Sequence, residues 1–264
     1  MDLIEINKKK LADETDLILK NLFPICRSIT GKGLRKTLNK LKKLTDFDIL
    51  EIPSNEKHYD WEVPDEWNIN DAYIEDSKGQ KVISFQDSNL HVMSYSTAVN
   101  SELNFNQLEP HLYTLPSLPD AIPYKTSYYN KSWGFCLTHN QLKNLDKNDT
   151  YKVFIDSSFS KGSLSLGEKK ILGNCKNAKN YLFTTYPCHP SLGNDNLSGI
   201  VLWALLLREM KKVKLRNNYR FVIHPETIGA VTYLSMNESE MLNIEGGFVI
   251  TTVAGPGQIG FKKT

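Results

Sequence analysis

Residues 186–199, which read Tyr-Pro-Cys-His-Pro-Ser-Leu-Gly-Asn-Asp-Asn-Leu-Ser-Gly, decide the predicted fold. An apolar, strand-like segment at 181–185 precedes them, and an apolar, helix-like segment at 200–208 follows. In open α/β sheets, functional residues lie on loops at the carboxyl ends of the strands. The order of strand, polar loop and helix therefore predicts a functional loop that carries His189 and Asp195.

A second junction of the same kind lies at 219–229, which reads Tyr-Arg-Phe-Val-Ile-His-Pro-Glu-Thr-Ile-Gly. It presents Glu226 in the same relation to its strand. An imidazole and carboxylates on such loops suit a divalent metal, above all zinc, and indicate a metal-assisted hydrolase. The alternative is purely structural, with His189 as a hydrogen-bonded turn residue and the Asp, Asn and Ser side chains around 195–198 as a helix N-cap cluster.

These residues resemble the signature of the co-catalytic zinc aminopeptidases, in which a His and a metal-bridging Asp precede a helix and a Glu follows on the next strand. His189, the Asp-Asn-x-Ser-Gly block at 195–199 and Glu226-x-x-Gly229 carry the likeness. Other stretches resemble a branch of aminopeptidase-like proteins associated with polysaccharide biosynthesis, namely 24–31, 60–64, 66–68, 133–137, 187–190 and 225–229. The resemblance implies zinc as the cofactor, His189 and Asp195 as metal ligands, and Glu226 as the catalytic general base.

The chain departs from this family pattern in three places. Thr227 stands where the family carries a ligating Glu, and no acidic residue lies at 249–257, where a ligating Asp is expected. The last ligand of the family, a His, would lie beyond Thr264, so the resemblance implies that a C-terminal part is missing. Since two conventional ligands remain, we expect at most one zinc ion per chain, and we expect it to be weakly bound.

The resemblance implies a hydrolase of peptide or amide bonds, and its substrate would be a small peptide or an amide on an amino sugar. Glu226 would take a proton from water and pass it to the leaving amine. The competing hypothesis is a catalytically inactive or truncated relative that binds a glycan or a peptide. Because ligands are missing, we expect little or no aminopeptidase turnover from the 264-residue chain.

Two further residues are candidates for substrate binding. Arg27 is a candidate clamp for a substrate carboxylate, and its alternative is an ordinary helix-surface arginine. His139 closes a strand-like segment at 133–139 downstream of a tyrosine cluster at 124–129, and it is a candidate third ligand or polar substrate contact. Aromatic rims bind sugars and peptide side chains, but for any individual aromatic residue here we favour a place in a small core of the insert.

The composition along the chain predicts two domains. Residues 11–43 show helical periodicity, whereas short apolar runs, frequent Pro and Asn and most of the aromatic residues follow until about residue 170. Alternation of strand, loop and helix then predicts a parallel α/β sheet. We expect an aminopeptidase-like α/β core with a parallel or mixed sheet and flanking helices, built from 1–54 and 171–264 and interrupted by an inserted β-rich domain at 55–170.

The overall composition is that of an ordinary globular protein, with 40% hydrophobic and 23% charged residues. A net charge of +2 gives no case for nucleic-acid binding. No segment approaches about 18 consecutive apolar residues, and no signal peptide is recognisable. We therefore expect a cytoplasmic protein without membrane contact, and the sequence does not indicate an oligomeric state.

The four cysteines include no Cys-x-x-Cys pair, which argues against a zinc ribbon. Cys188 lies next to His189 and could be read as a nucleophile. Neighbours on an extended segment point to opposite faces, however. We therefore expect Cys188 to point away from His189 and to act as a small buried apolar residue.

Overall fold

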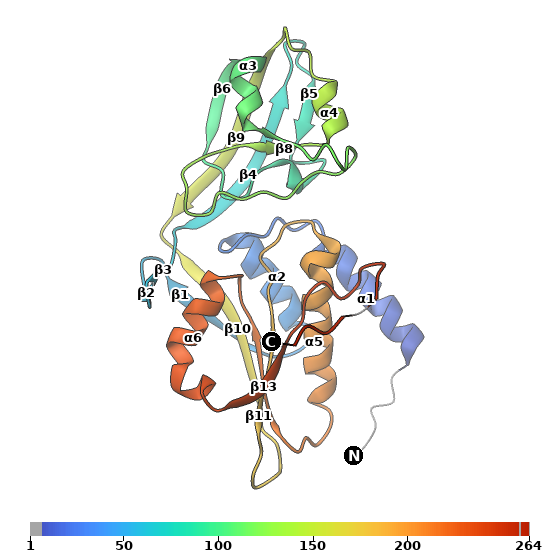
Figure 1. The fold of residues 1–264 in the computed structure, drawn as a ribbon, viewed down its shortest axis with the longest axis vertical. Coiled ribbons are helices and arrows are strands. Elements are labelled where there is room, and N and C mark those ends of the chain that lie inside the picture. The colour runs from blue at the N-terminus through green and yellow to red at the C-terminus, as the bar shows by residue number, and fades with distance from the viewer. Residues whose placement is uncertain (1–6, 259, 264) are drawn as a thin grey trace. The chain divides into compact units, whose positions relative to one another are not determined.

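The computed structural model describes residues 7–258 and 260–263 of the chain (Figure 1). The chain divides into two compact units, each with its own internal contacts. The first unit combines Met1–Pro64 with Gly162–Thr264, and the second is Asp65–Lys161. The candidate residues on the two strand-to-loop junctions all belong to the first unit.

The first unit is built on a five-stranded mixed sheet with the order β1-β10-β12-β11-β13. Its strands are β1 (Asp48–Pro53), β10 (Ser163–Ile171), β12 (Asn218–Ile223), β11 (Asn180–Thr185) and β13 (Ile244–Val249). β11 pairs in parallel with both β12 and β13, while β10 pairs antiparallel with β1 and β12. The carboxyl ends of β11 and β12 therefore meet at the same edge of the sheet.

The helices of this unit are α1 (Lys8–Leu22), α2 (Lys32–Lys42), α5 (Gly199–Met210) and α6 (Ile228–Met241). Apolar side chains of α1, α2 and α5 form one core with the sheet, and α6 lies on the other side of the sheet (Figure 1). Full burial of each large apolar side chain contributes about 1.5–3 kcal/mol. The members with the least exposure include Leu34, Leu38, Leu41, Phe47, Trp203 and Phe221. None of the helices in the described part of the chain has both the length and the apolar composition to cross a membrane.

The second unit is rich in short β-strands. A four-stranded antiparallel sheet has the order β5-β4-β9-β6 and encloses a core with residues such as Ile74, Phe135 and Val153. The remaining elements are two short strands, two short helices and two 3-10 turns. The bounds are β4 (Glu66–Glu75), β5 (Lys81–Ser84), β6 (Val99–Asn104), β7 (Leu112–Tyr113), β8 (Phe135–Cys136), β9 (Thr150–Ser160), α3 (Phe105–Leu108), α4 (His139–Lys143), η1 (Asn89–His91) and η2 (Glu109–His111).

The unit boundaries differ from the predicted 55–170 at both ends. β10 was expected in the insert, but it pairs on both sides with strands of the central sheet, and Leu164 and Leu166 are fully buried. The hairpin of β2 (Lys57–His58) and β3 (Trp61–Glu62) also belongs to the first unit, where both strands contact α6. The strands of the hairpin are short, and β10 is rich in polar and small residues, so the composition of these segments resembles the insert although their pairing does not.

Candidate functional site

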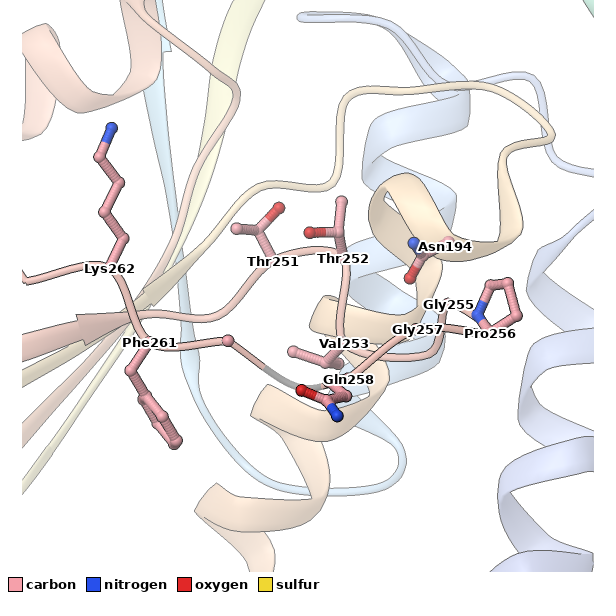
Figure 2. Close-up of a pocket in the computed structure, with 11 residues that line it drawn as sticks. Asn194, Thr251, Thr252, Val253, Gly255, Pro256, Gly257, Gln258, Phe261 and Lys262 are labelled. Carbon is pink, nitrogen blue, oxygen red and sulfur yellow. The ribbon is translucent and has the colours of Figure 1, made fainter.

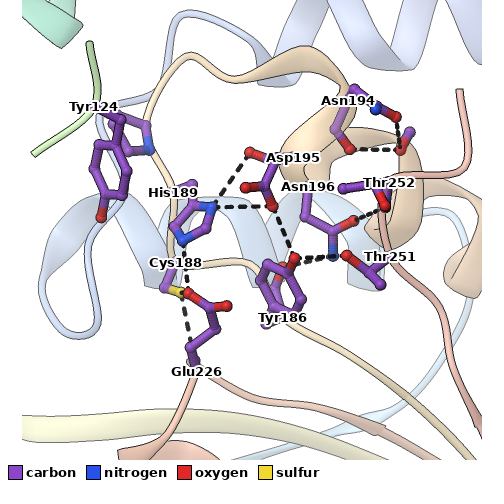
Figure 3. A network of polar contacts seen from close by, with 12 residues as sticks. Tyr124, Tyr186, Cys188, His189, Asn194, Asp195, Asn196, Glu226, Thr251 and Thr252 are labelled. Atoms are coloured by element: carbon purple, nitrogen blue, oxygen red, sulfur yellow. Dashed lines mark hydrogen bonds and ion pairs between the residues drawn. The ribbon is translucent and has the colours of Figure 1, made fainter. Parts of the chain in front are cut away.

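The two predicted junctions come together at the carboxyl edge of the sheet. β11 and β12 end level with each other, since Thr185 is in register with Ile223. The loops that follow bring His189 and Glu226 into contact, with His189 Nε2 2.7 Å from Glu226 Oε2 (Figure 3). The parallel pairing of two neighbouring strands therefore creates the site.

His189 lies between two carboxylates. Its Nδ1 is 3.3 Å from both the Oδ1 and the main-chain oxygen of Asp195, on the other side of the ring from Glu226. The His189 side chain is 7% exposed, whereas Asp195 and Glu226 are 45% and 42% exposed. Burial alone would lower the pKa of the imidazole, but hydrogen bonds to Cys188 and Glu226 and the charge of Asp195 raise it to about 10.

Glu226 is ionised in this arrangement. Its hydrogen bond to His189 lowers the pKa of the carboxyl group, and this effect outweighs the opposing effect of partial burial. Two carboxylates thus surround one positively charged imidazole. Without the extra proton on the imidazole, these side chains would form a set of nitrogen and oxygen donors of the kind that binds a divalent metal.

Cys188 joins the same group, which corrects our prediction that it points away from His189. Its Sγ accepts the main-chain N–H of Glu226 at 3.4 Å. The sulfur, a ring nitrogen of His189 and a carboxylate oxygen of Glu226 lie within 4.8 Å of one another. Alternation does not apply here because residues 186–189 are irregular rather than a strand. The signal that could have found Cys188 is the pair of prolines, Pro187 and Pro190, which prevents regular strand pairing of the Cys-His step.

Tyr186 holds Asp195 from the other side. Its hydroxyl donates to Asp195 Oδ1 at 2.8 Å and lies 2.5 Å from Thr251 Oγ1 (Figure 3). Burial raises the pKa of the Tyr186 phenol; the Thr251 contact opposes this effect and the Asp195 carboxylate adds to it. Tyr186 therefore remains a neutral donor and orients the carboxylate.

The polar residues of the loop bind the chain segment after β13. Within the turn Gly193–Ser198, Asn194 Oδ1 accepts the N–H of Ala254, and Ser198 Oγ accepts the N–H of Val253. Among the described residues, no side chain forms a capping hydrogen bond at the N-terminus of α5, so the alternative of an N-cap cluster is wrong. Gly199 is required here because a Cβ would lie 2.2 Å from Asn196 Oδ1.

A pocket of about 610 Å³ opens beside this loop (Figure 2). It is lined mainly by the segment after β13, with Asn194 contributed by the loop after β11. Within the described part of the chain, its lining includes none of the five predicted site residues. The pocket is therefore separate from the His189 group.

Arg27 has a different role from the predicted substrate clamp. Its side chain is 1% exposed, so it is not a helix-surface arginine either. Nε donates to the His189 carbonyl at 2.7 Å, Nη2 to the Pro190 carbonyl at 2.6 Å, and Nη1 to the Leu22 carbonyl at 2.7 Å. Burial lowers the pKa of the guanidinium to about 10, which leaves it charged at neutral pH. Arg27 therefore fixes the main chain of the loop that carries His189.

His139 belongs to the second unit. It is the first residue of α4, and its Nδ1 is 3.2 Å from Thr114 Oγ1. It is not a member of the Cys188–His189–Glu226 group found among the described residues. A role as a third ligand or a substrate contact stays a prediction.

The chain resembles known proteins over nearly all its length. The family described as "Domain of unknown function (DUF4910)" matches residues 16–264. A Clostridium acetobutylicum protein named for polysaccharide biosynthesis and an aminopeptidase-like domain is 47% identical over 258 residues. This match covers 98% of the chain and 59% of the relative, so the chain spans about three fifths of the length of that protein.

Solved structures show the same fold. A crystal structure of a Clostridium acetobutylicum protein described as a peptidase is 46% identical, with a TM-score of 0.88 over 94% of this chain and 60% of that one. BSAP, a zinc aminopeptidase from Bacillus subtilis, is 13% identical, with a TM-score of 0.56 over 96% of this chain and 70% of that one. The predicted aminopeptidase-like α/β fold is confirmed, and the chain belongs to the family described as "Domain of unknown function (DUF4910)".

Proposed function

We propose that the His189 group is the single-zinc site of an aminopeptidase-like hydrolase that cleaves a peptide or amide bond. One observation carries the proposal. The carboxyl ends of two neighbouring parallel strands deliver a histidine whose two ring nitrogens each face a carboxylate, at 2.7 Å for Glu226 and 3.3 Å for Asp195. The fold shared with a zinc aminopeptidase of Bacillus subtilis supports it.

The residues at the site fit zinc. Their donor atoms are an imidazole nitrogen, carboxylate oxygens and a thiol sulfur, which zinc accepts, whereas calcium and magnesium take oxygen ligands. His189 and Asp195 would hold the ion, and Tyr186 would orient Asp195 through its hydroxyl. When bound, zinc would lower the pKa of a water molecule and polarise the carbonyl of the scissile bond.

Glu226 has the properties of the general base. Its half-exposed carboxylate can accept a proton from water and deliver that proton to the leaving amine. The hydrogen bond to His189 now holds the pKa of Glu226 down. A ligating imidazole is neutral, so with metal bound Glu226 would no longer be paired with an imidazolium, and its carboxylate would be available to a water molecule.

The substrate is proposed to be a small peptide or an amide on an amino sugar. The second choice gains support from the name of the Clostridium acetobutylicum relative, which refers to polysaccharide biosynthesis. The alternative, binding of a glycan or peptide without turnover, is favoured by two positions. Thr227 is exposed and offers only a hydroxyl, and the segment after β13 brings Thr251 to Tyr186 without a carboxylate.

Metal binding is the first test of this proposal. We expect no more than one zinc ion per chain after dialysis, measured by elemental analysis, and a lower content in His189→Ala. His111→Ala, in the second unit, is the control and should retain the metal. Two tightly held zinc ions would contradict a single-metal site, and unchanged zinc in His189→Ala would remove His189 from the site.

Turnover is the second test. The protein, with added zinc, would be assayed against aminoacyl-anilides and N-acyl amino sugars. We expect at most weak, zinc-dependent hydrolysis of one of the two classes, because few ligands hold the metal. If no substrate of either class is hydrolysed while zinc is bound and a glycan or peptide binds in calorimetry, the non-catalytic alternative is correct.

A further inference from the structure

His189 and its three neighbouring donor side chains differ in how firmly they are held. Cys188 is fully buried and His189 nearly so, whereas the carboxylates of Asp195 and Glu226 are about half exposed. Buried side chains keep one rotamer, while exposed carboxylates can turn. The fixed pair of neighbouring residues, Cys188 and His189, therefore determines where an ion would be held.

We infer that the thiolate of Cys188 is a zinc ligand beside His189. It would replace the carboxylate ligand that is missing at Thr227. The inference rests on the proposed zinc site, and it requires the half-exposed carboxylate of Asp195, which is not part of the Cys188–His189–Glu226 group, to turn toward the same ion. The sulfur lies within 4.8 Å of both a His189 ring nitrogen and a Glu226 carboxylate oxygen. Cys26, Cys136 and Cys175 belong to no such group within residues 7–258 and 260–263.

The surroundings of the sulfur suit a ligand. The main-chain N–H of Glu226 donates to Sγ at 3.4 Å, and such hydrogen bonds to a ligating atom orient it and support its negative charge. This bond also joins the loop after β11 to the loop after β12. A carboxylate oxygen of Glu226 lies 3.9 Å from the same sulfur, which places the proposed base beside the ligand.

The chemistry of zinc makes a thiolate an adequate substitute for a carboxylate. Zinc binds Cys, His and Asp or Glu, and a catalytic site with two Cys and one His keeps an open position for substrate. On binding, the thiol loses its proton to solvent, so the sulfur ligates as a thiolate. A sulfur ligand also favours zinc, cobalt and cadmium over manganese and magnesium.

Cobalt substitution tests the inference directly. The metal-free 264-residue protein would be titrated with Co²⁺, and the absorption spectrum would be followed in the visible and ultraviolet ranges. We expect an ultraviolet thiolate-to-cobalt charge-transfer band that is lost in Cys188→Ser and kept in the control Cys175→Ser. Serine retains an acceptor for the Glu226 N–H, so the variant removes the sulfur and little else.

The outcomes separate this inference from the proposed function. Visible cobalt bands without the charge-transfer band would show that metal binds without Cys188, which overturns the inference and leaves the zinc site standing. Failure to bind either cobalt or zinc would remove the proposed function itself. If Cys188→Ser does not fold, the spectra of the unmodified protein and of Cys26→Ser, Cys136→Ser and Cys175→Ser still decide, because a band that persists in all three variants requires Cys188 as the sulfur ligand.

Discussion

The loop after β11 and the loop after β12 meet where Glu226 contacts Cys188 and His189, but the two loops are held in different ways. The first, at 186–198, is fastened by Arg27, by Tyr186 and by hydrogen bonds to the segment after β13. The second, at 224–227, is short, and Glu226 extends from it with a half-exposed carboxylate. The two sides of the site therefore suit different tasks.

A metal ligand has to keep its geometry, whereas a general base has to move a proton between two partners. The fastened loop carries His189 and Asp195, the proposed ligands. The short loop carries Glu226, the proposed base. If this division of tasks is correct, substitutions on the two loops should affect zinc content and turnover differently.

The largest effect is expected from Glu226→Gln. The amide keeps the shape of the side chain but cannot accept the proton, so kcat/KM should fall by about 10²- to 10⁴-fold. Zinc content should stay unchanged. Glu245→Gln, on exposed β13, is the control and should leave turnover unaltered. If Glu226→Gln loses zinc together with turnover, Glu226 is a metal ligand, and both loops bind the metal.

The next largest effect is expected from Arg27→Met, which removes the side chain that binds the loop at 186–198. Three buried carbonyl groups would lose a charged donor, which should lower the free energy of unfolding by about 3 kcal/mol. Urea denaturation measures this change. The exposed Arg216→Met should change it by no more than about 0.5 kcal/mol, and an equal loss in both variants would mean that Arg27 does not fix the loop.

Tyr186→Phe should weaken zinc binding by about tenfold, because a hydrogen-bond partner that orients a metal ligand is removed. Competition with a chelator would measure the affinity. Tyr181→Phe, on β11, serves as the matched control. An unchanged affinity would show that Asp195 does not bind the metal in its present orientation.

The smallest effect is expected on the short loop, from Thr227→Gly. Thr227 has a φ of 55°, which is unfavourable for a β-branched residue. Relief of this strain should exceed the entropic cost of glycine and raise the free energy of unfolding by about 0.5–1 kcal/mol. Thr150→Gly, in β9, should lower it instead. A loss of stability at Thr227 would show that the short loop stores no strain.

Much of the α/β core follows from local patterns. The apolar segments at 181–185 and 200–208 became β11 and α5, and the spacing of Leu34, Leu38 and Leu41 forms the buried face of α2. β10 was not predicted as a strand of the central sheet, because it is rich in polar and small residues and has no apolar run. Its place depends on main-chain pairing with both neighbours, which composition does not reveal.

The site was predictable where it depends on sheet geometry. Parallel strands end at one edge, so His189 and Glu226 had to be near each other. Cys188 was missed because prolines make its segment irregular, and an alternation rule fails there. Arg27 was singled out, but with the wrong role, because its partners are main-chain carbonyls far along the chain, and carbonyls carry no sequence signal.

The bond from Arg27 to His189 joins residues separated by 162 positions. Chains fold from the N-terminus as they are made. Arg27 is made early, but it can form this hydrogen bond only after the second unit and β11 have been made. The loop that carries His189 therefore reaches its final shape late in folding. A peptide that contained both loops but not the first helices would hold all the donors and still bind zinc poorly.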